Sequence, residues 1–144
     1  MRVVYDGAAL LDTAAIYSLF DETDRLHAAA REFFTANLTT TVWFAVNTTS
    51  HECYTRIRYD LSHAKALAAF GLLRGVPIKT LPFEDADEAN ALQILRKYDD
   101  QALSFQDALC AAVMKRVGIY KVFTFDADFW TMGFQVIPGT TRPR

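Results

Sequence analysis

Five acidic side chains lie where apolar segments of the sequence begin or end. They are Asp12, Glu52, Asp107, Asp126 and Asp128. Hard divalent cations such as Mg²⁺ and Mn²⁺ prefer carboxylate and water oxygens, whereas carboxylates crowded together without a cation repel one another. Two such cations about 4 Å apart can clamp a phosphodiester, activate a water and stabilise the leaving oxygen. The pattern therefore predicts a metal centre if folding brings these acids together.

Each acid also has an ordinary structural explanation. Asp107 can cap a helix, and Asp12 can cap the helix that follows it. Asp126 and Asp128 can be turn residues after a strand, and Glu52 can be a solvated charge on a helix. The joint placement of the five favours the metal centre, although spacing alone favours it only modestly.

Residues 103–129 predict a helix, a turn and a strand with acids at both ends. Ser104 is placed to cap the helix, with Asp107 at the third helical position. Gly118 ends the helix, and the β-branched and aromatic residues 122–125 predict a short buried strand. Acids at such positions can converge at the carboxyl edge of a parallel sheet, where open α/β folds bind their ligands.

The rest of the chain alternates between strand and helix patterns. Strands are predicted at 8–11, 39–44, 76–81 and 134–137. Helices are predicted at 13–20, 48–59, 62–73 and 84–98, and a further helix is expected to begin after a cap at Asp24. Pro77 places the third strand near a sheet edge. The helix at 84–98 is expected to turn Ala86, Ala89 and Leu92 inward, with Ile94 or Leu95. This alternation predicts an α/β fold with a mostly parallel sheet and helices on both faces.

Composition predicts one globular domain. The chain has 144 residues, of which 51% are apolar and 22% charged, as in ordinary soluble proteins. No apolar run approaches the roughly 20 residues of a membrane span, and residues 1–7 lack a secretory signal. We therefore expect a cytoplasmic protein without membrane contact. Cys53 and Cys110 lack a zinc or disulfide pattern and are expected to be buried thiols.

The charge balance does not indicate a nucleic-acid binder. Fifteen basic residues against seventeen acidic ones give a net charge of −2. Attraction to a nucleic acid must then come from bound cations or from local basic patches. The candidate patches, each of which could equally be a solvated face, are Arg56/Arg58, Lys115/Arg116/Lys121 and Arg142/Arg144. The sequence shows neither a glycine-rich phosphate loop nor a convincing nucleophile–base arrangement.

With these residues in view, the chain resembles the PIN-domain nucleases, most of all the VapC-type ribonuclease toxins of toxin–antitoxin pairs. The similar segments are 9–34, 48–58, 103–119 and 122–138, of which the last two are the most specific. The resemblance implies a PIN-like three-layer fold around about four or five strands. It also implies that Asp12, Glu52, Asp107 and Asp126 are catalytic metal ligands, with Asp128 as a further ligand and Thr124 as polar support.

Two positions depart from the family pattern. Ala14 stands where the family often has Asn or Ser, which removes one polar contact to substrate or water. Asp6 follows the apolar residues 3–5 and so also fits the start of the family pattern, a strand followed directly by the first aspartate. Asp12 is preferred because the residues that follow it have the family spacing.

The resemblance implies metal-dependent hydrolysis of RNA phosphodiester bonds, with Mg²⁺ or Mn²⁺ as the cofactor. It also implies a small antitoxin as partner, and a homodimer is expected because homodimers are the commonest symmetric assemblies. Two alternatives remain. One is an interaction module that is held by an antitoxin and is hardly active alone. Its groove or dimer face would use the aromatic residues of the N-terminal half, which could equally pack in the core: Tyr17, Phe20, Phe33, Phe34 and Trp43. The other is an α/β phosphohydrolase that acts on small phosphate esters.

Overall fold

The computed structural model describes residues 7–139, and these residues are built around one parallel sheet of five strands. The strands are β1 (Gly7–Leu11), β2 (Thr41–Val46), β3 (Lys79–Leu81), β4 (Lys121–Phe123) and β5 (Gln135–Ile137). Their order in the sheet is β3-β2-β1-β4-β5, so the first strand lies in the middle and the Pro77-containing segment leads into an edge strand, as predicted. Every pairing is parallel.

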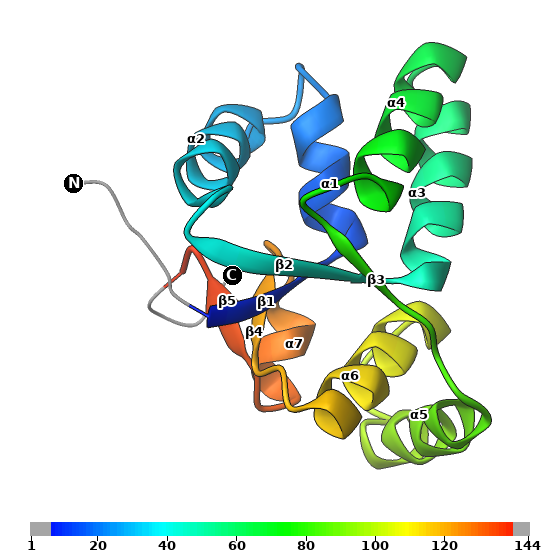
Figure 1. Cartoon of the computed structure of the whole chain (residues 1–144). Helices are drawn as coiled ribbons and strands as arrows, with labels where there is room; N and C mark the ends of the chain where they lie inside the picture. The colour runs from blue at the N-terminus through cyan, green and yellow to red at the C-terminus, as the bar shows by residue number, and fades with distance from the viewer. Residues whose placement is uncertain (1–6, 140–144) are drawn as a thin grey trace.

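Within the described residues, seven helices cover the two faces of this sheet (Figure 1). On one face lie α1 (Thr13–Phe20), α2 (His27–Asn37), α3 (Asn47–Asp60) and α4 (His63–Arg74), and on the other α5 (Asp85–Lys97), α6 (Phe105–Val117) and α7 (Ala127–Thr131). The predicted three-layer α/β fold is therefore confirmed. No helix within residues 7–139 combines the length and apolarity needed to cross a membrane.

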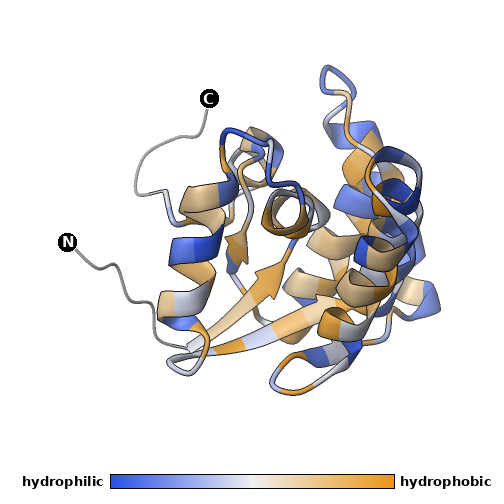
Figure 2. Cartoon of the chain, turned by 90° about the horizontal axis from the view of Figure 1, so that it is seen from above, coloured by the Kyte–Doolittle hydropathy of each residue, from blue (hydrophilic) through white to orange (hydrophobic). Residues whose placement is uncertain are grey.

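The core divides into two layers because successive side chains of a strand point to opposite faces. In β1, Ala9 and Leu11 pack towards α1–α4, whereas Leu10 packs towards α5–α7. Figure 2 shows mostly apolar strands flanked by helices that carry both polar and apolar residues.

Aromatic rings fill much of the α1–α4 side. The ring of Phe33 lies 5.0 Å from that of Phe123, and the Trp43 ring lies 5.4 Å from that of Phe34. The indole N–H of Trp43 also donates to the backbone oxygen of Asn37, at 3.1 Å. Phe33, Phe34 and Trp43 are therefore core residues, as the plain packing alternative predicted.

The predicted inner face of α5 is wrong at Ala86, Ala89 and Leu92 and correct at Ile94, one of the two alternatives for its last position. The helix buries Asp87, Ala91 and Ile94 and leaves Ala86, Ala89 and Leu92 exposed. Asp87 can occupy the inner face because Arg116 of α6 donates to both of its carboxylate oxygens, at 3.0 and 3.1 Å. Because the first residue of the buried stripe is an acid, apolar periodicity alone does not reveal the stripe.

Some predicted boundaries also shift. Asp24 does not cap α2: that helix begins at His27 without a side-chain cap, and Asp24 accepts from the Leu26 backbone N–H in the preceding turn, at 2.8 Å. The second strand ends two residues beyond the predicted Phe44, at Val46, and the fourth ends at Phe123 instead of residue 125. Asp6, residues 3–5 and the Arg142/Arg144 patch lie outside the described residues.

Candidate metal centre

Asp12 lies at the carboxyl end of the central strand. Its backbone N–H donates to the Phe123 oxygen at 3.1 Å, which continues the pairing of β1 with β4. Its side chain caps α1, because Oδ2 accepts from the Ala14 N–H at 3.4 Å. The residue is 3% exposed. The cap explanation and the site explanation are therefore compatible at this position.

Thr124 connects Asp12 to the acids that follow β4. Its hydroxyl donates to Asp12 Oδ2 at 2.7 Å and accepts from the Asp126 N–H at 3.0 Å. Asp126 Oδ1 in turn accepts from the Asp128 N–H at 2.9 Å and so caps α7. Sequence reasoning placed Asp126 and Asp128 after the strand but missed this five-residue helix, for which the capping residue Asp126 was the available signal.

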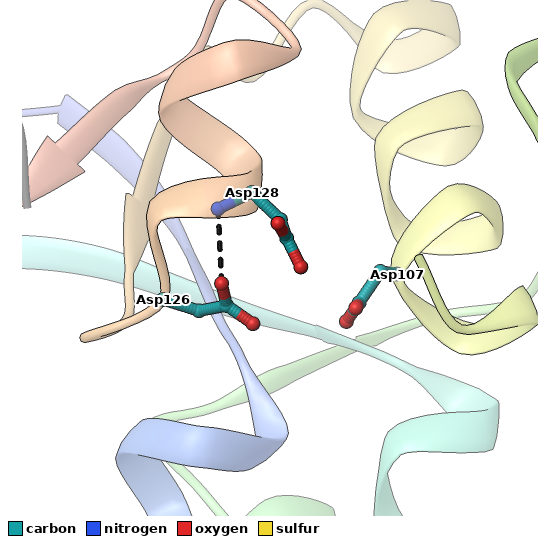
Figure 3. A group of neighbouring side chains, drawn as sticks. All are labelled: Asp107, Asp126 and Asp128. Atoms are coloured by element: carbon teal, nitrogen blue, oxygen red, sulfur yellow. Dashed lines mark hydrogen bonds between the residues drawn. The ribbon is translucent and has the colours of Figure 1, made fainter. Parts of the chain in front are cut away.

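Asp107 reaches the same place from the other side of the site. It is the third residue of α6, and its N–H donates to the Ser104 hydroxyl at 3.0 Å, as the sequence predicted. Figure 3 shows the side chains of Asp107, Asp126 and Asp128 turned towards one another. One carboxylate oxygen from each lies within 4.8 Å of the other two.

This spacing fits a divalent cation. Oxygen ligands lie about 2.0–2.6 Å from Mg²⁺ or Ca²⁺, so the ligands of one ion are at most about 5 Å apart. The all-carboxylate donor set is also the chemistry that such hard cations select. Asp107, Asp126 and Asp128 can therefore hold a divalent cation together.

Asp12 and Glu52 lie outside this triplet but interact with it electrostatically. Burial raises the pKa of Asp12 to about 7, with the charges of Asp107 and Asp126 adding to the rise. Burial and then the charge of Asp107 raise the pKa of Glu52 on α3. The fold thus brings all five predicted acids into one electrostatic neighbourhood.

The triplet itself contains two acids whose ionisation is disfavoured. Burial and then the charges of Asp126 and Asp107 raise the pKa of Asp128 to about 6. The pKa of Asp107 is raised by burial and by Asp126, against the effect of its Ser104 hydrogen bonds. Among residues 7–139, no Lys or Arg forms an ion pair with any of the five acids. A bound cation would remove this electrostatic cost.

A polar bracket that the sequence analysis missed joins α3 to α6 near the acids. The side-chain amide of Gln106 donates to the Thr49 hydroxyl at 3.0 Å and to the Cys110 sulfur at 3.3 Å. It therefore fixes the helix of Asp107 against the helix of Glu52. Cys110 and Cys53 are buried free thiols, as predicted, and burial raises the pKa of Cys53 to about 12.

The family of the chain follows from comparison with known proteins. Residues 9–135 match the family model of the PIN domain, and the chain therefore belongs to the PIN domain family, which confirms the resemblance. In two strains of Mycobacterium tuberculosis, CDC 1551 / Oshkosh and H37Rv, the 23S rRNA-specific endonuclease VapC20 is 27% identical to it over 127 residues. The match covers 86% of this chain and 93% of the relative.

Solved structures support the same relationship. The crystal structure of M. tuberculosis VapC20, a sarcin–ricin loop cleaving toxin, superposes with a TM-score of 0.82 at 25% identity, over 94% of this chain and 99% of that one. FitAcB from Neisseria gonorrhoeae has a TM-score of 0.66 at 19% identity, over 89% and 95% of the two chains. VapBC2 from Rickettsia felis, bound to a promoter DNA fragment, has a TM-score of 0.64 at 9% identity, over 90% and 96%. The last two show the shared fold.

Proposed function

We propose that this chain is a single-domain, metal-dependent endoribonuclease and the toxin of a toxin–antitoxin pair. The observation that carries the proposal is the convergence of oxygens from Asp107, Asp126 and Asp128 within 4.8 Å, beside the buried Asp12. The named activity of the VapC20 relatives, cleavage of 23S rRNA, supports RNA as the substrate class. A structured ribosomal RNA loop is the first substrate to test.

The catalytic set in this proposal is Asp12, Glu52, Asp107 and Asp126, with Asp128 as a further ligand and Thr124 as support. The cofactor is Mg²⁺ or Mn²⁺. When bound, such a cation offsets carboxylate repulsion, activates water for in-line attack on phosphorus and stabilises the developing negative charge.

The protein's own contribution is to hold the acids in position before substrate arrives. Thr124 fixes the Asp12 carboxylate, Ser104 fixes the helix start that carries Asp107, and Gln106 fixes that helix against α3. Metal binding must also displace the proton that the raised pKa of Asp12 partly retains near neutral pH.

A groove on the α1–α4 side supports an antitoxin as the partner. It has a volume of about 640 Å³ and is lined by Leu19, Phe20, Glu22, His27, Arg31, Phe34 and Leu72. An apolar floor with charged residues beside it suits an amphipathic helix laid into a groove.

We place the protein in the cytoplasm with a small antitoxin there, and propose a homodimer. Co-purification of a small co-expressed protein, lost when Phe20 is changed to Glu, tests the groove.

The activity is tested with purified full-length chain and a structured RNA in Mg²⁺ or Mn²⁺. Asp107→Asn should slow cleavage at least about 100-fold, because removing one preorganised charged group typically costs that much. The matched control is Asp100→Asn, an exposed acid in the turn before α6. Unchanged cleavage by Asp107→Asn would exclude Asp107 from catalysis. Turnover of small phosphate esters with indifference to RNA would favour the phosphohydrolase alternative instead.

A further inference from the structure

A hollow of about 350 Å³ opens directly beside the metal centre, with Asp126 in its wall. Tyr17 of α1, Arg56 of α3 and Phe125 of the β4–α7 turn also line it, and Asp24 contributes a carboxylate. The volume falls within the roughly 300–1,000 Å³ of sites that bind small organic groups. The carboxylates at the metal centre do not fill this space, so it is available to a part of the substrate next to the reacting phosphate.

Arg56 is the cation of this hollow. Its guanidinium carbon lies 4.3 Å from the centre of the Tyr17 ring, and the side chain is exposed. Within residues 7–139, Arg56 has no carboxylate oxygen within 4.0 Å. A stacked guanidinium keeps its planar fork of N–H donors, which matches the geometry of a phosphate. Arg56 is thus held by a ring and retains donors for a second partner.

The remaining walls differ in chemistry. The half-buried ring of Phe125 offers an apolar face, and aromatic rings and guanidinium planes are the surfaces on which unpaired RNA bases stack. Asp24 and Asp126 repel phosphate. A phosphate in the hollow is therefore directed to Arg56, and a base is directed to the aromatic wall.

We propose that this hollow binds one nucleotide of the RNA next to the scissile bond, with Arg56 pairing with its phosphate and Phe125 packing against its base. The proposal deepens the proposed nuclease function and rests on it for the identity of the substrate. It adds Arg56 and Phe125 as substrate-binding residues outside the carboxylate cluster. It also supplies the local attraction that a chain of net charge −2 needs.

The first experiment measures binding without cleavage. A fluorescein-labelled ten-nucleotide RNA is titrated by anisotropy in Mg²⁺ with full-length protein carrying Asp107→Asn, alone or with a second substitution. Arg56→Gln should weaken binding at least about five-fold and reduce the slope of log affinity against log salt by about 0.7, the contribution of one phosphate contact on a single strand. Arg58→Gln, an exposed arginine on the same helix that does not line the hollow, should leave both unchanged.

Phe125→Leu separates stacking from charge. Loss of base stacking should weaken binding at least about five-fold. The salt slope should stay unchanged, because no phosphate contact is lost. Equal effects of Arg56→Gln and Arg58→Gln, or wild-type binding by both Arg56→Gln and Phe125→Leu, would overturn the subsite.

Arg56 also acts on Glu52, because its charge opposes part of the rise in the pKa of Glu52 that burial and Asp107 cause. The cleaving protein with Arg56→Lys tests this, since lysine keeps the charge but loses the planar fork. The subsite predicts a raised KM for both Arg56→Gln and Arg56→Lys, with kcat changed less. A fall in kcat for Arg56→Gln that Arg56→Lys restores, with KM constant, would assign Arg56 to Glu52 instead.

The two proposals fail separately. If the wild-type chain cleaves RNA but the Arg56 variants bind as it does, the subsite falls and the nuclease stands. If the chain cleaves no RNA yet Arg56→Gln still weakens RNA binding with the expected salt slope, the hollow is an RNA-binding site, but its place next to a scissile bond falls with the nuclease.

Discussion

Asp12 and Asp87 are both buried aspartates, yet their pKa values shift in opposite directions. Asp12 is 3% exposed and Asp87 is fully buried. The pKa of Asp12 rises to about 7 through burial and neighbouring acids. For Asp87, burial acts in the same direction, but hydrogen bonds from Arg116 and the Glu84 backbone, with the charge of Arg116, outweigh it and lower the pKa.

The difference lies in where the positive charge comes from. Between α5 and α6 the protein supplies its own cation, Arg116, 3.0 Å from the Asp87 carboxylate. At the carboxyl edge of the sheet it supplies Thr124, backbone N–H groups and further acids, and the described residues provide no ion pair. The two acids share burial and differ in the partner of the carboxylate.

The largest effect should follow from Asp12→Asn. It removes a charge from the proposed catalytic set and should lower the rate of RNA cleavage about 100- to 1,000-fold at pH 7.5 in saturating Mg²⁺. Cleavage kinetics on a structured RNA measure this. The comparison variant, Asp87→Asn, should cleave at the wild-type rate per folded molecule, and equal losses in both variants would erase the distinction.

Asp87→Asn should instead lower stability. Removing one partner of a buried ion pair costs several kcal/mol, here about 2–4 because asparagine retains an acceptor for the Glu84 N–H. Urea unfolding monitored by circular dichroism gives the free energy of unfolding. A loss below about 0.5 kcal/mol would mean that the Arg116 pair contributes little.

Asp12→Asn should raise the stability of the metal-free protein while it slows RNA cleavage. A carboxyl whose folded-state pKa is raised holds a proton that the unfolded chain has released, so wild-type stability falls as pH rises from about 4 to about 7. The variant lacks this loss, so its free energy of unfolding should exceed that of the wild type by about 1–4 kcal/mol at pH 8 and should not exceed it below pH 4. Thermal melts in EDTA across this range test it, and a destabilised variant at pH 8 would contradict it.

The smallest effect concerns acid unfolding. Because the folded-state pKa of Asp87 is lowered, its contribution to stability is complete above its unfolded pKa of about 3.9 and is lost as pH falls through the folded value. Asp87→Asn should therefore flatten the dependence of stability on pH below about 4. Unfolding free energies at pH 2.5 and 5 measure the slope. The same slope in variant and wild type would remove Asp87 from the acid response.

The sequence revealed features that depend on neighbours along the chain. The Ser104 cap with Asp107 three residues later, the Gly118 helix end and the acid after the first strand are set by local backbone rules. These rules and the family pattern were enough to predict the α/β fold. The five site acids were also named, and their roles stay predictions until variants are measured.

Features that depend on distant partners could not be predicted in this way. Asp87 can be buried because it pairs with Arg116, 29 residues later, and the apolar pattern of its own helix gives no sign of that partner. The bracket between Gln106 and Thr49 spans 57 residues. Asp126 and Asp128 were recognised, but their exact arrangement depends on a hydrogen bond between Thr124 and Asp12, 112 residues apart.

The central position of β1 has a consequence for synthesis. Asp12 belongs to a strand that pairs with β4 on one side, and the hydroxyl that fixes it is at residue 124. During translation the growing polypeptide can build β1 to α5 while the pocket still lacks Asp107, Thr124, Asp126 and Asp128. The proposed metal centre therefore stays incomplete until residues 121–128 have left the exit tunnel and docked against the first strand.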